Sequence, residues 1–210
     1  MNGQKLIGLM LLVGIITLIG SFFFEPGGGD ESDPAASIAA VLNAPVQTAL
    51  SNTVAFVGMI LILLGLAYYA RRNQSGDQPD IVNIASSLAL VSVAAAAVAV
   101  TVYNMVIDDG TPAEYHELLY RLSDSLFIAM VSLVGLSLLL LALGLFRRQT
   151  TLLLKASWGV VALIGLSLFA MTSMIFDDMD GVVEIIGSIG FFGFPLVPIV
   201  LGVRSLRAKE

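Results

Sequence analysis

The sequence predicts an all-α integral membrane protein with six transmembrane helices in a single domain. Long apolar stretches dominate the 210 residues, of which 57% are hydrophobic. Only 12% of the residues are charged, against about 25% in an average soluble domain. About 20 consecutive apolar residues suffice to cross the hydrocarbon core of a bilayer as a helix. The six predicted spans cover about residues 6–24, 46–70, 81–107, 123–146, 152–176 and 182–203.

The basic residues predict how these spans are oriented. Nine of the ten Lys and Arg residues lie at alternate ends of the apolar stretches, so that one membrane surface is basic. Because loops rich in Lys and Arg stay in the cytoplasm, we predict a multi-pass protein of the cell membrane with both termini cytoplasmic. The spans would then form three antiparallel hairpins. The nine basic residues are Lys5, Arg71, Arg72, Arg147, Arg148, Lys155, Arg204, Arg207 and Lys209.

The first span and the loop after it carry two further predictions. The apolar run over 6–24 is longer than the apolar core of a typical signal peptide, so we expect a retained helix instead of a cleaved one. In the outer loop 25–45, Asp33-Pro34 fits a helix start. The small apolar stretch 35–42 then suits a short helix lying on the membrane surface, which Asn43-Ala44-Pro45 would end.

Small residues and helix breakers predict how particular spans pack. The span 81–107 is rich in Ala and Ser, which let helices approach closely, so we expect it at the centre of the bundle. The segment 111–114, Thr-Pro-Ala-Glu, fits a capping box whose helix continues into the fourth span. In the sixth span, Pro195 and Pro198 should kink or loosen the helix. Three glycines of that span form a smooth stripe for a neighbouring helix: Gly187, Gly190 and Gly193.

The predicted membrane interior contains no ionisable side chain near mid-span. Such groups are costly in a bilayer and mark proton relays, voltage sensors and paths for charged substrates, so these functions are disfavoured. The chain has no cysteine, which excludes disulfides and thiolate sites, and its net charge of −6 disfavours nucleic acid as a partner. We find no nucleophile elbow, phosphate-binding loop, zinc motif or dinucleotide fingerprint, and we predict no catalytic residue.

The outer surface holds the polar side chains that could form a site. Thirteen of the sixteen acids are predicted there, with Arg121 and the single histidine, His116, as candidates for ion pairs. Oxygen ligands suit Ca²⁺ or Mg²⁺, so one interpretation is a hard-cation site, and the other is an acidic face that is simply solvated. The candidate ligands are Asp108, Asp109, Asp124, Asp177, Asp178 and Asp180.

In layout the chain resembles the small multi-helix membrane proteins that are widespread in bacteria and archaea. The resemblance rests on an early span with a long outer loop, glycine-rich spans, and the basic pairs Arg71-Arg72 and Arg147-Arg148. It includes no diagnostic motif and implies no binding or catalytic residue.

Three functions are consistent with these observations. The first is a non-catalytic subunit or scaffold that packs against other membrane proteins or against itself, which the missing chemistry and the small-residue faces favour. The second is a carrier or channel for a neutral or lipidic solute, with the proline and glycine residues of the sixth span as its moving part. The third is a membrane enzyme or cation site at the outer acids. We expect membrane lipids to surround the protein, and a bound lipid is one candidate ligand. No cofactor is predicted.

Overall fold

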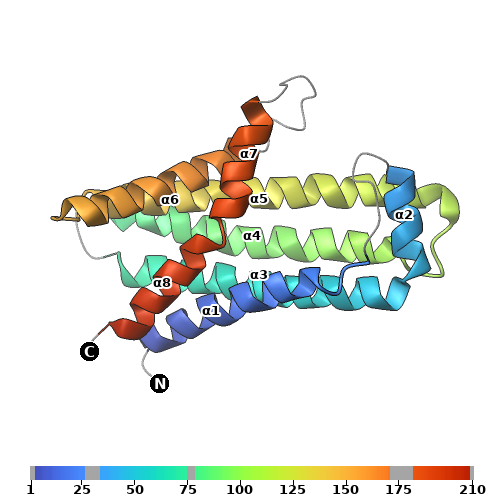
Figure 1. The fold of residues 1–210 in the computed structure, drawn as a ribbon, viewed down its shortest axis with the longest axis horizontal. Coiled ribbons are helices and arrows are strands. Elements are labelled where there is room, and N and C mark those ends of the chain that lie inside the picture. Colours follow the sequence, from blue (N-terminus) through green and yellow to red (C-terminus); the bar gives the residue numbers. More distant parts are fainter. Residues whose placement is uncertain (1–2, 27–33, 75–78, 171–181, 209–210) are drawn as a thin grey trace.

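The computed structural model describes residues 3–26, 34–74, 79–170 and 182–208, and every regular element in these ranges is a helix (Figure 1). The helices are α1 (Gly3–Phe22), α2 (Pro34–Asn43), α3 (Pro45–Arg72), α4 (Pro79–Val106), η1 (Ala113–Tyr115), α5 (His116–Phe146), α6 (Leu152–Ala170), α7 (Val182–Gly193) and α8 (Leu196–Arg207). The element η1 is a single 3₁₀ turn that leads into α5.

Six helical segments are long and apolar enough to cross a membrane, which confirms the predicted class of integral membrane protein. They are Gly3–Phe22, Pro45–Arg72, Pro79–Val106, Ala113–Phe146, Leu152–Ala170 and Ser188–Arg207. As predicted, the helix that begins near Ala113 continues into the fourth span without a break. The last residues of the predicted fifth span, 171–176, lie outside the described residues.

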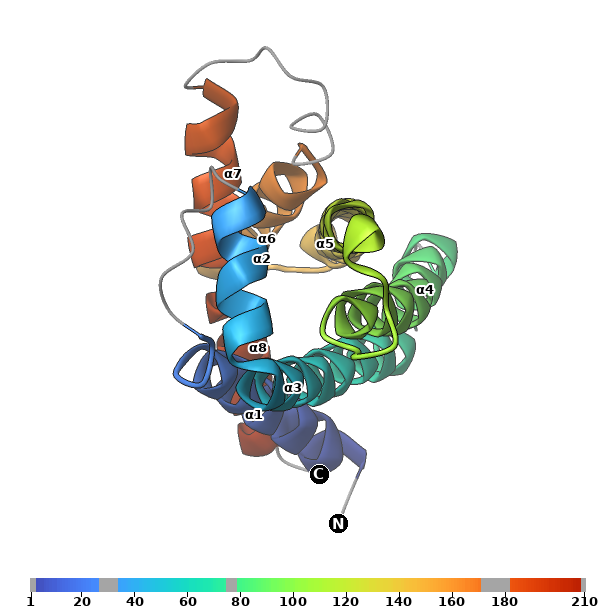
Figure 2. The same cartoon turned by 90° about the vertical axis from the view of Figure 1, so that its right-hand side faces the viewer.

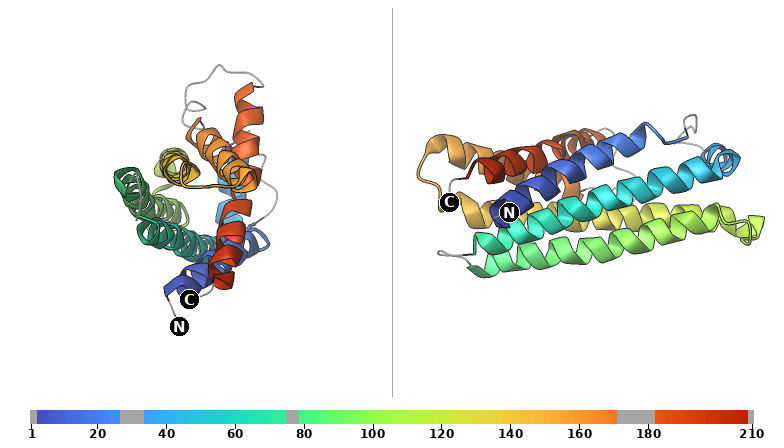
Figure 3. Two further views of the ribbon diagram at one scale, coloured as in Figure 1. Left: turned by 90° about the vertical axis from the view of Figure 1, so that its left-hand side faces the viewer. Right: turned by 90° about the horizontal axis from the view of Figure 1, so that it is seen from below.

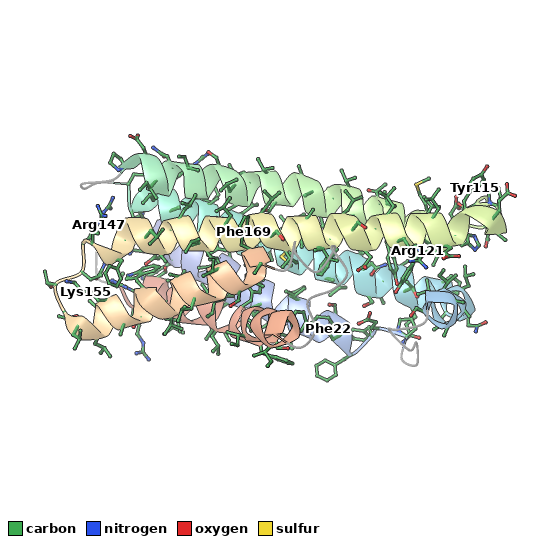
Figure 4. The ribbon with its side chains drawn as sticks, turned by 90° about the horizontal axis from the view of Figure 1, so that it is seen from above. Phe22, Tyr115, Arg121, Arg147, Lys155 and Phe169 are labelled. Atoms are coloured by element: carbon green, nitrogen blue, oxygen red, sulfur yellow. The ribbon has the colours of Figure 1, made fainter. Side chains whose placement is uncertain are left out.

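The six spans are arranged in a ring (Figure 2). Around it, α1 packs against α3 and α8, α4 against α3 and α5, and α6 against α5 and α7. Helix α1 begins, and helix α8 ends, at the same end of the ring (Figure 3). Arg147 and Lys155 lie at that end, called the basic end below, whereas Tyr115 and Arg121 lie at the opposite α2 end (Figure 4).

The prediction that the third span lies at the centre of the bundle is wrong. Helix α4 makes extensive contacts with α3 and α5 only, and its outer face, including Val91 and Val98, is exposed. Its small residues serve these two contacts: the hydroxyl of Ser137 in α5 donates to the carbonyl of Ala85 at 2.7 Å, and that of Ser86 donates to Ala67 of α3 at 3.2 Å. Small side chains allow close approach on each side without requiring a neighbour on every side.

Glycines set the closest helix contacts. A Cβ on Gly165 of α6 would lie 2.6 Å from the backbone nitrogen of Leu139 in α5, and one on Gly58 of α3 would lie 2.6 Å from the backbone nitrogen of Leu18 in α1. The remaining core is large and apolar, and it fills the half of the ring near the basic end. Its members include Leu11, Ile62, Leu66, Leu138, Leu141, Trp158 and Leu201.

The short helix predicted after the first span is present as α2, which lies across the end of the ring (Figure 2). It ends at Asn43 and α3 begins at Pro45, as the break at 43–45 predicts. The hydroxyl of Thr48 holds this corner by donating to the carbonyl of Ala44 at 3.0 Å. Helix α2 begins at Pro34, as Asp33-Pro34 predicts, whereas Asp33 itself lies outside the described residues.

The predicted capping box at 111–114 does not form. Pro112 precedes η1 in an extended conformation, with φ −60° and ψ 139°, and no side chain caps the turn. The backbone nitrogen of Thr111 instead donates to the carbonyl of Asp108 at 2.9 Å. The segment therefore forms a tight turn before α5, because the chain must reverse direction within a few residues after α4.

The sixth span is broken at Pro195, between α7 and α8. Proline lacks the N–H that would continue the helical hydrogen bonds, so the predicted weakening is confirmed there. Pro198 lies in the first turn of α8, where a missing N–H is tolerated, and causes no break. Two glycines of the predicted stripe contact α6: a Cβ on Gly190 would lie 2.9 Å from the backbone nitrogen of Leu168, and one on Gly193 would lie 2.8 Å from the side chain of Ile164.

Candidate functional site

A cavity of about 970 Å³ occupies the half of the ring at the α2 end. Helices α1, α3 and α5 form its walls, α2 covers it, and Leu168 of α6, the end of α7 and the α7–α8 junction complete its lining. The apolar core fills the other half of the ring, so this space extends from the α2 end to about the middle of the bundle. The cavity lies inside the ring because the ring has no central helix.

Polar side chains gather at the mouth of this cavity. Glu25 follows α1, Tyr103 lies in the last turn of α4, and Tyr120, Arg121 and Asp124 lie in the first turns of α5. The rings of Tyr103 and Tyr120 are 5.9 Å apart, and Glu25 is close enough to Tyr103 to interact electrostatically. Two tyrosines, two carboxyl groups and a guanidinium therefore surround the opening.

The first turns of α3 add a polar stripe to one wall. Thr48, Ser51 and Asn52 line the cavity there, and Ala55 and Met59 continue the same face toward mid-membrane. Two of these side chains also join helices. The hydroxyl of Ser51 donates to the carbonyl of Ser21 in α1 at 3.0 Å, and the amide of Asn52 donates to the Asn104 side chain of α4 at 3.4 Å.

Deeper in the bundle the lining is apolar. Met59, Met130 and Val134 form the walls, and Leu168 and Phe194 close the inner end. Flexible methionine side chains adapt to ligands of irregular shape. A polar mouth above an apolar interior is the arrangement that fits an amphiphile with one polar end and one hydrocarbon end.

The predicted cation site is not assembled by the described residues. Within those ranges, no three carboxylate or histidine side chains are grouped closely enough to hold a metal ion. Asp108 and Asp109 are exposed in the turn after α4, whereas Asp124 lines the cavity. The remaining candidates, residues 177, 178 and 180, lie outside the described residues, so the cation site stays a prediction.

Arg121 and His116 have partners other than the predicted aspartates. Arg121 lies at the α2 end (Figure 4), where it forms a 2.9 Å ion pair with Glu117 one turn earlier in α5. Both side chains are 63% exposed, so this pair contributes little to stability. The ring of His116 forms a 3.2 Å hydrogen bond with the carbonyl of Thr111 and thereby helps to hold the turn before α5.

Most of the cavity lining was not predicted from the sequence. The polar stripe of α3 is the one signal that could have indicated it, because Thr48, Ser51 and Asn52 lie at helical spacing on one face of an otherwise apolar span. Met59, Met130 and Val134 carry no such signal. The hydropathy of an apolar side chain within a span is the same whether it faces lipid, the protein core or a cavity, so the sequence does not distinguish these positions.

No protein-family model, no curated protein and no solved structure matches this chain.

Proposed function

We propose that this integral membrane protein binds and carries an amphiphilic, lipid-like solute. The cavity at the α2 end carries the proposal, because its 970 Å³ lie within the range of small-molecule sites, about 300–1,000 Å³. Along α5 its lining residues run from Tyr120 to Val134, about 21 Å of helix, which is comparable with one leaflet of a bilayer including its headgroups, about 20 Å. A solute could therefore place its head at the mouth and its chain among the methionines.

The charges at the mouth favour a neutral or zwitterionic head. Glu25 and Asp124 are acidic, and Arg121 is the one cationic side chain of the described lining. Arg121 is already paired with Glu117, so it offers only part of its donor capacity to a ligand. An anionic head would meet two carboxylates, and like charges in a partly desolvated site disfavour binding.

The side of the ring between α1 and α7 is the route by which we expect the solute to enter. Ile19 and Phe22 of α1 and Phe191 and Phe192 of α7 line the cavity and are also exposed. Figure 4 shows Phe22 directed away from the ring. The break at Pro195 lets α7 move relative to α8, and such movement would widen this opening.

The placement in the membrane is part of the same proposal. We place the basic end in the cytoplasm of the cell, with both termini there and the spans paired as three hairpins. The distribution of Lys and Arg supports this orientation. The mouth of the cavity would then open in the outer leaflet.

Photolabelling with a diazirine derivative of phosphatidylcholine tests the proposal. In the wild-type protein we expect adducts at cavity residues such as Met59 and Phe194, located by mass spectrometry of peptides. Ala55→Trp should fill the cavity and reduce these adducts by at least about tenfold, which corresponds to about 1.4 kcal/mol of binding free energy.

Val57→Trp is the matched control, because Val57 lies on the same helix, is 46% exposed and does not line the cavity. This variant should label at the wild-type level. Absence of cavity adducts in the wild-type protein, or equal labelling of the two tryptophan variants, would contradict the proposal. Thermal unfolding of each variant shows whether it is folded.

Self-association through α4 is a second candidate, in line with the subunit function that the sequence favours. The exposed residues Ser87, Ala94 and Thr101 recur every seventh position on the outer face of α4, with Val91 and Val98 between them. Small residues at this spacing allow a second helix to approach closely.

Cross-linking tests this candidate, because the chain has no native cysteine. We expect Ala94→Cys to give a covalent dimer when membranes are treated with a short bismaleimide. Leu163→Cys, at an exposed position in the middle of α6, should remain monomeric. Equal dimer yields from the two variants, or none from either, would count against a specific α4 interface.

A further inference from the structure

A second cavity, of about 740 Å³, lies at the basic end, where α1, α3 and α8 meet. We call it the α8 pocket. Its polar lining comes from Gln4 of α1, Tyr69 and Asn73 of α3, and Arg204, Ser205 and Arg207 of α8. It is separated from the first cavity by the apolar core, so it does not belong to the site described above.

Three side chains of this pocket, Ser205, Arg204 and Arg207, could donate hydrogen bonds to a ligand. Ser205 is only 1% exposed, and its hydroxyl has no hydrogen-bond partner among the described residues. A buried hydroxyl without a partner is destabilising, so a hydrogen bond from Ser205 to a ligand oxygen in this pocket would be favourable. Arg204 and Arg207 are exposed, and within the described ranges neither guanidinium forms an ion pair.

The rest of the pocket is apolar and continues onto the outside of the ring. Ile199, Val200 and Val203 line it, and Val200 is 57% exposed. Contact with this apolar lining would not increase the affinity for a free phosphate ion, whereas the acyl chains of a phospholipid would pack against it. The pocket thus places two guanidinium groups and a hydroxyl next to a lipid-facing surface.

We propose that the α8 pocket binds the phosphate headgroup of an anionic phospholipid from the leaflet at the basic end. Arg204 and Arg207 donate hydrogen bonds to the phosphate oxygens, and Ser205 supplies its hydroxyl to the same group. Guanidinium groups match phosphate geometry well, and basic pockets beside transmembrane helices select anionic headgroups. This site goes beyond the proposed carrier function, since it lies at the other end of the ring and binds an anionic headgroup, whereas the mouth of the first cavity favours a neutral or zwitterionic one.

The single tryptophan provides the assay. Trp158 is the only tryptophan of the chain, is 3% exposed, and its ring lies 6.4 Å from that of Tyr69, which lines the α8 pocket. The full-length protein is reconstituted in vesicles that contain dibrominated phosphatidylglycerol or dibrominated phosphatidylcholine at equal mole fraction. At each mole fraction tested, we expect the brominated phosphatidylglycerol to quench Trp158 more strongly than the brominated phosphatidylcholine.

Arg204→Gln and Arg207→Gln should each reduce the preference for phosphatidylglycerol over phosphatidylcholine by about fivefold. This factor corresponds to the binding free energy that one basic side chain contributes at an anionic surface, about 1 kcal/mol. Ser205→Ala should also reduce it, and in lipid-free detergent it should leave the melting temperature unchanged or raise it, because a buried hydroxyl without a partner is removed. Arg147→Gln is the control. Arg147 is exposed at the same end and does not line the pocket, so the preference should stay at the wild-type level.

Three results would overturn the proposal. Equal quenching by the two lipids in the wild-type protein would show no anionic site near Trp158. An equal loss in Arg147→Gln and Arg204→Gln would show a general effect of surface charge. Inorganic phosphate that abolishes the preference, at constant ionic strength, would identify a site for the free ion and exclude the lipid.

Discussion

Gly165→Ala is expected to reduce the free energy of unfolding by about 3 kcal/mol, because it would force α5 and α6 apart. An added Cβ would lie 2.6 Å from the backbone nitrogen of Leu139 and 2.7 Å from the carbonyl oxygen of Gly135. Both atoms belong to the backbone of α5, so no side chain can rotate away. For a chain of this length the melting temperature in detergent should fall by roughly 10 °C, which circular dichroism would measure.

Gly159→Ala is the matched control for this prediction. It makes the same change on the same helix, at a position where a Cβ would meet no atom within 4 Å. Because alanine favours a helix over glycine by about 0.5–1 kcal/mol, this variant should be as stable as the wild-type protein or slightly more stable. If both alanine variants melt at the same temperature, α5 and α6 do not touch at Gly165.

The membrane-spanning helices could be predicted because hydropathy along the chain reports directly on transfer into a bilayer. The prolines were also informative, since Pro45 begins α3 and Pro195 separates α7 from α8. The position of α4 was not predictable from composition. Alanine and serine side chains are compatible with a helix neighbour or with lipid, and only the arrangement of the other five spans decides which faces are covered.

The candidate site was predictable only in part. Asp124 and Arg121 were identified from their polarity, and the structure places them at the mouth of the cavity, although Arg121 pairs with Glu117. The cavity itself is a space between helices. It depends on where the apolar core stops, beyond residues such as Leu138, and no residue in the sequence marks that boundary.

The proposed orientation of the ring in the membrane predicts an all-or-none labelling result. Ala113 is the first residue of the fourth span, Thr150 lies four residues beyond its last residue, Phe146, and both are exposed. Between them the helix is about 50 Å long, enough to cross a bilayer once. With no native cysteine, Ala113→Cys should react with a membrane-impermeant maleimide on intact cells, whereas Thr150→Cys should react only after the membrane is permeabilised.

The same two variants separate the helix count from the orientation. Labelling of Thr150→Cys but not Ala113→Cys on intact cells would keep the transmembrane helix and reverse the orientation, and the cavity would then open toward the cytoplasm. Labelling of both, without permeabilisation, would mean that α5 does not cross the membrane. Since α5 contributes a wall of the cavity and packs against α4 and α6, that result would remove the basis for a lipid-carrying site inside the ring.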